Sequence, residues 1–258
     1  MAQPQIDTAP KDLNKRRRGA FAEIRRNAVV GTGKRLRRTF DALIGRYSVI
    51  PNVPVLSRKE FDWAPALENE WEAIRDEAMA VLNHRNKIPP LSTISPDHAR
   101  IAKGDDWRSF FLWGYGFRID ENCERCPKTA EIVERIPGLQ TAMFSILAPG
   151  AHIPPHRGVT KAIINCHLAL VTPAGAENCW IRIDRDRYGW RNGETLIFDD
   201  TFEHEVRNAT DEDRIVLLLQ VSRPVRFPGN LAAKLFFGAV RRSPFISDAR
   251  ENLRDWRL

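Results

Sequence analysis

The sequence predicts a mainly β domain of the double-sheet jelly-roll type, flanked by helices at its N- and C-terminal ends. From residue 140 onward, short apolar runs of strand length follow one another. Turn-forming pairs such as Pro149-Gly150 and Asn192-Gly193 separate these runs. Helical patterns precede and follow them. Several short strands with turn signals between them are typical of an all-β sandwich or barrel.

Two helices are predicted ahead of the strands. Apolar residues at alternating steps of four and three predict an amphipathic helix over 66–84. Pro127 can open a short helix that runs to Arg135, where Pro137-Gly138 ends it. The apolar residues of the longer helix are Leu67, Trp71, Ile74, Ala78 and Val81.

Apolar runs bounded by turn residues predict the strands. Beyond them, after Pro224 and Pro228, the pattern becomes helical again over 229–240. The predicted strands cover 110–116, 141–147, 162–171, 179–185, 195–198 and 214–221.

Length and charge divide the chain. Its 258 residues fit one medium domain with appendages, and no apolar run approaches the roughly 18 residues that span a bilayer. Residues 1–46 hold twelve Lys or Arg and four Asp or Glu, a net +8. Residues 223–258 hold eight and three, a net +5, so the total of +7 leaves −6 for 47–222. We therefore distinguish a basic N-terminal segment (1–46), a body with the strands (47–224) and a basic helical tail (225–258).

The basic ends point to an anionic partner. Within the first segment, Leu36, Phe40, Leu43 and Ile44 recur at helical spacing among arginines. Basic amphipathic helices of this kind often lie on anionic membrane surfaces. A helix docked on the domain with solvated charges is the equal alternative, and nucleic-acid binding ranks third.

The cellular location follows from signals at the N-terminus and from cysteine usage. The N-terminus lacks the layout of a secretory signal, and four cysteines at uneven spacings do not suggest a disulfide scaffold. We expect a cytoplasmic protein, peripheral on the inner membrane face if its basic ends bind lipid.

Candidate site residues lie between 156 and 214. His156 and His204 sit at the edges of strand-like runs, and Arg214 begins an apolar strand. This layout is typical of a non-haem Fe(II) oxygenase, in which imidazoles hold the metal and open positions take the cosubstrate and O2. Arg214 could bind a dicarboxylate by a bidentate pair. A salt bridge of Arg214 to Asp199 or Asp200 is the alternative.

The chain resembles the aspartyl/asparaginyl β-hydroxylases over roughly residues 105–224. The resemblance rests on several short motifs in a specific order and spacing. They include Cys126-Pro127-Lys128-Thr129, Phe144-Ser145-Ile146, Pro155-His156-Arg157-Gly158, Cys166-His167-Leu168, Phe198-Asp199-Asp200-Thr201-Phe202-Glu203-His204 and Asp213-Arg214-Ile215.

The resemblance implies a double-stranded β-helix, the cupin-like form of the jelly roll, and a hydroxylase that uses Fe(II), 2-oxoglutarate and O2. His156 and His204 then look like the iron ligands. Arg214 looks like the partner of the distal carboxylate of 2-oxoglutarate, helped by Ser145, and His167 like a contact near its metal-binding end.

Two positions depart from the pattern. Gly158 stands where most Fe(II)/2-oxoglutarate enzymes have a carboxylate ligand, so water would fill that coordination position. Asn165 stands where the family usually has arginine. Lys161, four residues earlier and on the same face if 161–171 is a strand, could supply the missing charge as a further cosubstrate contact.

The substrate is left open between several classes. The basic ends and the similarity of 178–193 to the bacterial lipid hydroxylases of the family favour a lipid acyl chain, such as that of lipid A or ornithine lipid. Gly158 and the motif around His204 favour an Asp or Asn side chain in a peptide, and a free amino acid or other small molecule is a further option. A non-catalytic jelly-roll binding module is the alternative from another class.

Overall fold

The computed structural model describes residues 37–85, 88–94, 101, 104–174 and 177–241. Residues 1–36 of the basic N-terminal segment and residues 242–258 of the tail lie outside these ranges, so the expectations on them stay untested. Within the part described, no helix is long and apolar enough to cross a membrane.

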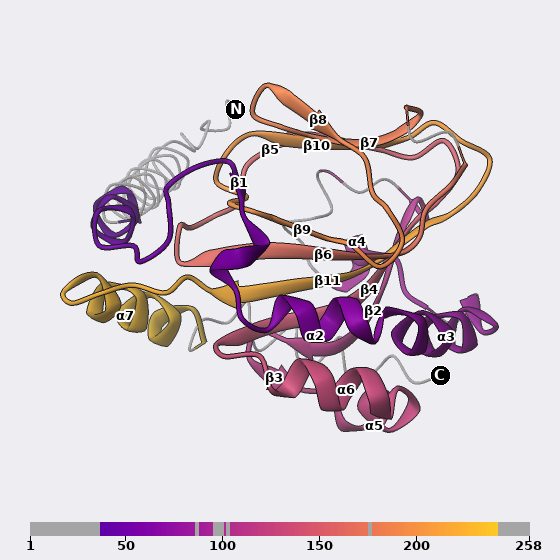
Figure 1. Cartoon of the computed structure of the whole chain (residues 1–258), viewed down its shortest axis with the longest axis horizontal. Coiled ribbons are helices and arrows are strands. Elements are labelled where there is room, and N and C mark those ends of the chain that lie inside the picture. Colours follow the sequence, from indigo (N-terminus) through magenta and orange to yellow (C-terminus); the bar gives the residue numbers. More distant parts are fainter. Residues whose placement is uncertain (1–36, 86–87, 95–100, 102–103, 175–176, 242–258) are drawn as a thin grey trace, which may run out of the picture.

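Two antiparallel sheets form the body (Figure 1). The larger has the strand order β1-β9-β6-β11-β4-β2-β3 and the smaller the order β5-β10-β7-β8. This mainly β, double-stranded β-helix architecture is the one that the sequence predicts. The strands of the larger sheet are β1 (Val55–Leu56), β2 (Trp107–Gly114), β3 (Phe117–Arg118), β4 (Leu139–Leu147), β6 (Ile163–Val171), β9 (Thr195–Phe198) and β11 (Arg214–Ser222). Those of the smaller are β5 (His152–His156), β7 (Cys179–Ile183), β8 (Asp186–Tyr188) and β10 (His204–Asn208).

Alternation along the central strands separates two apolar cores. On β4, Met143 and Leu147 pack into the cluster shared with the smaller sheet, whereas Phe144 and Ile146 pack into the cluster on the other face. Because β4, β6 and β11 are paired in register, the side chains of Ser145, His167 and Arg214 share the face of Met143 and Leu147. This interior face carries the candidate site.

Helices cover the outer face of the larger sheet (Figure 1). The helix predicted over 66–84 is two helices that break at Glu70. The carboxylate of Glu77 then accepts hydrogen bonds from the backbone N–H groups of Lys128 and Thr129, both at 2.8 Å, and so caps another helix. The helical elements before β11 are η1 (Arg58–Glu60), α2 (Ala64–Asn69), α3 (Trp71–Leu82), α4 (Leu91–Ile94), α5 (Asp120–Arg125) and α6 (Pro127–Glu134).

Five strands were not predicted from the sequence: β1, β3, β5, β8 and β10. Strand β5 reads His152-Ile153-Pro154-Pro155-His156, which looks like a turn because two prolines lack the donor that a ladder needs. It is an edge strand of the smaller sheet, where such positions are tolerated.

At one end of the sheets, residues 37–46 are helical and pack beside α7 (Gly229–Arg241). Ile44 of the first helix is buried against Ala232 and Ala233 of the second. The carboxylate of Asp41 accepts hydrogen bonds from the Thr160 hydroxyl at 2.9 Å and the Lys161 backbone N–H at 2.8 Å. The helix 37–46 is therefore anchored to the loop that follows β5.

Candidate metal centre

His156 and His204 lie next to each other on two neighbouring strands of the smaller sheet. They are direct partners in the antiparallel register of β5 and β10, and their ring centroids lie 4.1 Å apart. Antiparallel pairing therefore brings together two imidazoles that are 48 positions apart in the sequence. Two neighbouring imidazoles of this kind are a common beginning of a metal site.

Backbone carbonyls fix the orientation of both rings. His156 Nδ1 lies 2.8 Å from the carbonyl oxygen of Pro154, and His204 Nδ1 lies 3.0 Å from that of Phe202. A carbonyl can only accept, so each Nδ1 donates its proton and each Nε2 keeps a lone pair for a metal. Backbone carbonyls, and not the carboxylates of Asp199 or Asp200, therefore orient the two imidazoles.

Burial keeps both imidazoles neutral. It lowers the pKa of His156 below its usual value, and burial together with the neighbouring His156 ring lowers the pKa of His204 to about 4. Only the neutral ring binds a metal. The pair is thus prepared for a metal ion at physiological pH.

Gly158 lies directly against Asp200. A Cβ built on Gly158 would fall 2.1 Å from Asp200 Cγ, and the Gly158 N–H donates to the Asp200 carbonyl at 2.7 Å. The Asp200 carboxyl is buried and accepts a hydrogen bond from Asn165 Nδ2 at 3.2 Å. Its Oδ1 atom has no hydrogen-bond partner among the residues placed in the structure. Burial, followed by the charge of Asp199, raises the pKa of Asp200 to about 7.

Arg214 is the largest fully buried side chain, with 1% of its surface exposed. Its Nε and Nη1 atoms have no partner in the described part of the chain, and its guanidinium lies 4.7 Å from the ring centroid of Trp190. Burial lowers the pKa of Arg214 to about 10, so the group stays charged at neutral pH. A buried cation without a counter-ion is costly, and a bound anion would relieve that cost.

A row of rings connects the histidine pair to this guanidinium. Phe198 packs edge-on against His204 at 5.6 Å and against His167 at 5.1 Å, and His167 lies 6.1 Å from Trp190, all between centroids. His167 is buried, its Nδ1 has no partner within the described ranges, and burial lowers its pKa well below the usual value. A continuous series of packed rings thus connects three predicted site residues, His204, His167 and Arg214.

Ser145 lies on the same interior face. Its hydroxyl accepts a hydrogen bond from Trp107 Nε1 at 2.9 Å, across the pairing of β2 with β4. Sequence reasoning did not select Trp107, the first residue of β2, or Trp190, in the loop between β8 and β9, because an apolar aromatic residue is more often an ordinary core residue.

Lys161 lies outside β6 and has partners of its own. Its ammonium group contacts Asp199 at 2.9 Å, Asn52 at 2.7 Å and the Thr201 hydroxyl at 3.1 Å. Asp199 also pairs with the buried Arg223. The strand begins at Ile163 rather than 161, so alternation does not direct Lys161 inward, and its charge is balanced by Asp199.

The alternative of a salt bridge from Arg214 to Asp199 or Asp200 is not observed among the described residues. The carboxylate of Asp199 pairs with Lys161 and Arg223, and the Asp200 carboxyl accepts a hydrogen bond from Asn165. Arg223 was missed by sequence reasoning, since its position after an apolar strand gives no signal of its partner.

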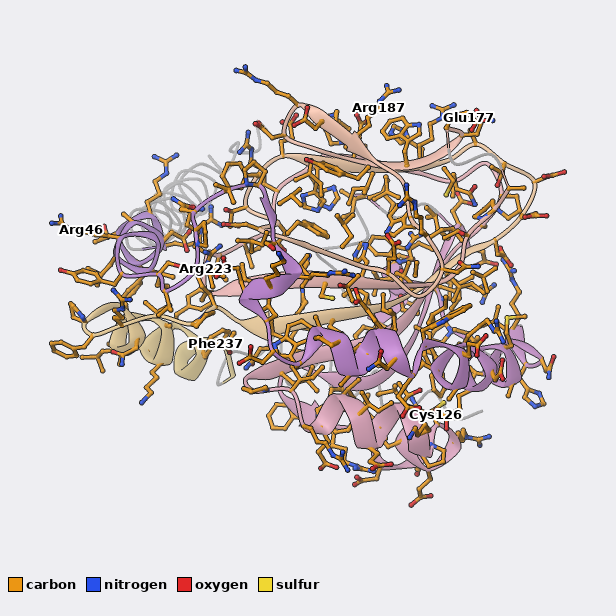
Figure 2. The ribbon with its side chains drawn as sticks, viewed as in Figure 1. Arg46, Cys126, Glu177, Arg187, Arg223 and Phe237 are labelled. Carbon is orange, nitrogen blue, oxygen red and sulfur yellow. The ribbon has the colours of Figure 1, made fainter. Side chains whose placement is uncertain are left out.

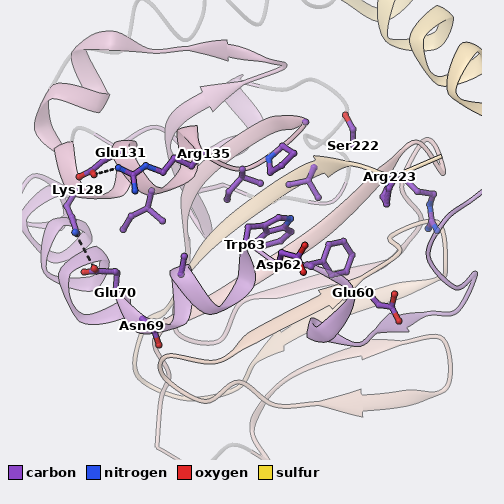
Figure 3. A pocket seen from close by; sticks show the side chains of 18 residues that line it. Glu60, Asp62, Trp63, Asn69, Glu70, Lys128, Glu131, Arg135, Ser222 and Arg223 are labelled. Carbon is purple, nitrogen blue, oxygen red and sulfur yellow. Dashed lines mark hydrogen bonds and ion pairs between the residues drawn. The ribbon is translucent and has the colours of Figure 1, made fainter. Parts of the chain in front are cut away.

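Within the ranges described, no group of three or more His, Cys, Asp or Glu side chains is placed to hold a metal ion. His156 and His204 are the candidate protein ligands of this centre. A hollow of about 880 Å³ lies elsewhere, between α2, α6 and the end of β11 (Figure 3). Charged residues on its rim pair with each other, Lys128 with Glu70 and Arg135 with Glu131.

The fold and this centre define a double-stranded β-helix protein with a pair of facing imidazoles and a buried cation whose Nε and Nη1 atoms have no hydrogen-bond partner among the described residues. The chain belongs to the aspartyl/asparaginyl beta-hydroxylase family, whose model matches residues 68–224. It is thus a member of a hydroxylase family.

Two relatives show the range of this similarity. The chain is 36% identical over 211 residues to the ornithine lipid ester-linked acyl 2-hydroxylase of Rhizobium tropici, and this match covers 82% of this chain and 75% of that protein. It is 34% identical over 168 residues to the aspartyl/asparaginyl beta-hydroxylase of Homo sapiens, and this match covers 63% of this chain but only 21% of that much longer protein.

Proposed function

We propose that the protein is an Fe(II)- and 2-oxoglutarate-dependent dioxygenase that hydroxylates an unactivated C–H bond. The observation that carries the proposal is the buried guanidinium of Arg214, unpaired within the described chain, on the interior face that leads to the His156–His204 pair. A dicarboxylate that binds a metal at one end needs a cation at the other. Membership of a hydroxylase family supports the same chemistry.

His156 and His204 would hold Fe(II) through their Nε2 atoms. Bound Fe(II) supplies the oxidation, in which O2 and 2-oxoglutarate give the hydroxylated product, succinate and CO2. The protein contributes two neutral ligands and a buried interior. With two imidazoles instead of two imidazoles and a carboxylate, water would fill the position that Gly158 leaves without a protein ligand, and the unpartnered Oδ1 of Asp200, which lies against Gly158, could accept a hydrogen bond from that water.

Arg214 would hold the distal carboxylate of 2-oxoglutarate. Its free Nε and Nη1 atoms can donate a charge-assisted pair, which a dry site strengthens. The Ser145 hydroxyl, already an acceptor for Trp107, can donate to the same carboxylate. His167 is neutral and can contact the cosubstrate near its metal-binding end.

We propose a membrane-lipid acyl chain as the substrate. The support is the relative from Rhizobium tropici, an acyl 2-hydroxylase of the ester-linked chain of ornithine lipid, whose similarity extends over most of both chains. Hydroxylation of Asp or Asn in a peptide is the second candidate, favoured by the human relative and by Gly158.

One experiment tests the chemistry and the substrate class separately. Purified protein with Fe(II), ascorbate and 2-oxoglutarate should form succinate, and the His156→Ala and His204→Ala variants should not. Ornithine lipid offered as the substrate should gain one oxygen atom by mass spectrometry. Oxygen added to an Asp- or Asn-containing peptide but not to lipid would replace the first substrate by the second, and normal turnover in both histidine variants would refute the site.

A further inference from the structure

Exposed large hydrophobic side chains gather at one end of the molecule. Among the described residues seven such side chains are exposed, and six lie on three segments, 47–54, 157–161 and 224–235. The seventh, Met79, is on α3 at the opposite end of the sheets (Figure 1). The six are Val49, Val53, Val159, Phe227, Leu231 and Leu235.

Hydrogen bonds join the three segments into one surface. The Val49 N–H donates to the Pro224 carbonyl at 2.9 Å, and the Lys161 ammonium donates to Asn52 Oδ1 at 2.7 Å. We call this surface, together with the helix 37–46 that Asp41 anchors to it, the basic end.

The strongest apolar feature of the basic end is a stripe along α7. Leu231 and Leu235 lie about one turn apart on α7 and are 49% and 57% exposed, and Phe227, two residues before the helix begins, is 74% exposed. The spacing of Leu231 and Leu235 puts their side chains on one face of the helix. The opposite face of α7 is already used, since Ala232 and Ala233 are buried against the helix 37–46. The stripe is therefore a second apolar face, and a face of this kind indicates an interaction site.

Positive charge surrounds the stripe. Residues 37–54, 157–161 and 224–238 hold seven Lys or Arg and one carboxylate, that of Asp41. Asp41 is turned inward to Thr160 and Lys161 and does not offset the surface charge. Figure 2 shows Arg46 pointing outward at this end. The exposed basic residues are Arg37, Arg38, Arg46, Arg157, Arg226 and Lys234.

We propose that the basic end docks on an anionic phospholipid bilayer, with Phe227, Leu231 and Leu235 inserted among the acyl chains and the basic side chains at the headgroups. An apolar stripe bordered by Lys and Arg matches the boundary between hydrocarbon and anionic headgroups. A second copy of this chain fits the face poorly, because two such surfaces would bring like charges together.

Docking there has a consequence for the candidate metal centre. The loop 157–161, which belongs to the basic end, begins at the residue after His156. A docked protein would therefore hold β5, the strand that carries His156, beside the bilayer. In this respect the proposal rests on the proposed lipid substrate and deepens it, whereas binding to the bilayer needs neither iron nor 2-oxoglutarate.

Vesicle sedimentation tests the proposal. The full chain should sediment with vesicles of phosphatidylglycerol and phosphatidylcholine at low salt, separate from them at about 1 M salt, where the screening length falls to about 3 Å, and ignore pure phosphatidylcholine. The triple variant Phe227→Ser/Leu231→Ser/Leu235→Ser should lower the partition coefficient at least tenfold, about 1.4 kcal/mol. The matched control is Met79→Ser, which removes an exposed apolar side chain at the other end and should bind as the parent does.

A charge test is independent of the apolar one. Arg226→Glu/Lys234→Glu should lower binding at least tenfold, whereas Arg191→Glu, on a side chain 82% exposed in another loop, should not. Circular dichroism and succinate formation without vesicles should match the parent in every variant, which separates this test from that of the iron chemistry. Absence of vesicle binding by the parent, or undiminished binding by the triple variant, would overturn the proposal. Loss of a dimer in the triple variant, with no vesicle binding by the parent, would assign the surface to self-association instead.

Discussion

The carboxyl group of Asp200 occupies the space that a side chain at position 158 would need, with 2.1 Å between its Cγ and the Cβ that any other residue would place there. The Asp200 carboxyl can thus occupy this space only because residue 158 is a glycine and has no side chain. A carboxyl lies against this position, but it belongs to Asp200 in the segment before β10 and not to residue 158 in the loop after β5.

Gly158→Ala should therefore destabilise the protein. The contact is with a buried carboxyl that is also held by Asn165, so accommodation requires displacement of both and should cost about 1–3 kcal/mol. Urea denaturation at constant m-value measures this cost. The double variant Gly158→Ala/Asp200→Gly should recover most of it relative to Asp200→Gly alone, and equal costs in the two backgrounds would contradict the contact.

Arg214→Met should stabilise the ligand-free protein and abolish its response to 2-oxoglutarate. The guanidinium is buried without a counter-ion, and replacement by an apolar side chain of similar length removes that cost. Thermal unfolding with and without 2-oxoglutarate measures both effects. The parent should gain stability as the ligand concentration rises, and the variant should not. In Arg214→Lys, which keeps the charge but not the bidentate geometry, the apparent constant for 2-oxoglutarate should rise about tenfold or more. An unchanged constant for 2-oxoglutarate would show that a residue other than Arg214 binds its distal carboxylate.

Asp200 should make stability fall as pH rises. Its pKa is about 7 in the folded protein and 3.8 when unperturbed, so the folded state holds a proton between these values that the unfolded state has lost. Stability from this group is complete below pH 4 and is lost as pH rises through 7, by at most about 4 kcal/mol. In metal-free protein, Asp200→Asn should match the parent near pH 4 and exceed it at pH 8. Parallel stability curves over that range would show that Asp200 does not titrate in this way.

Glu77→Ala should loosen the attachment of α6. The carboxylate caps two backbone N–H groups and accepts from the Thr129 hydroxyl at 2.6 Å, so its loss should cost about 1–2 kcal/mol. Glu72→Ala, on an exposed position of the same helix, serves as the control and should change stability by less than about 0.5 kcal/mol. Equal effects of the two substitutions would show that the cap is unimportant.

Much of the interior could be predicted from period-two alternation. Predicted strand ranges for β4, β6, β9 and β11 fall within two residues of the observed ones. Ser145 and His167 were selected through the family resemblance, and that they share one face with Arg214 follows from the observed register of β4, β6 and β11.

Contacts between distant segments could not be predicted in the same way. The prolines of β5 prevented the prediction of the strand that carries His156. No local pattern near Gly158 indicates its contact with Asp200, 42 positions later. The suggestion for Lys161 required a strand from residue 161, and that condition is not met, because β6 begins at Ile163. Each of these features depends on packing between segments, which one sequence does not encode as a local pattern.

The two prolines of β5 also bear on self-assembly. Strand β5 forms one outer edge of the smaller sheet, where unpaired backbone donors would offer a template for a strand of another molecule. Pro154 and Pro155 have no N–H to offer, and they immediately precede His156. The edge that carries a candidate metal ligand is thus protected against the addition of a strand from another molecule.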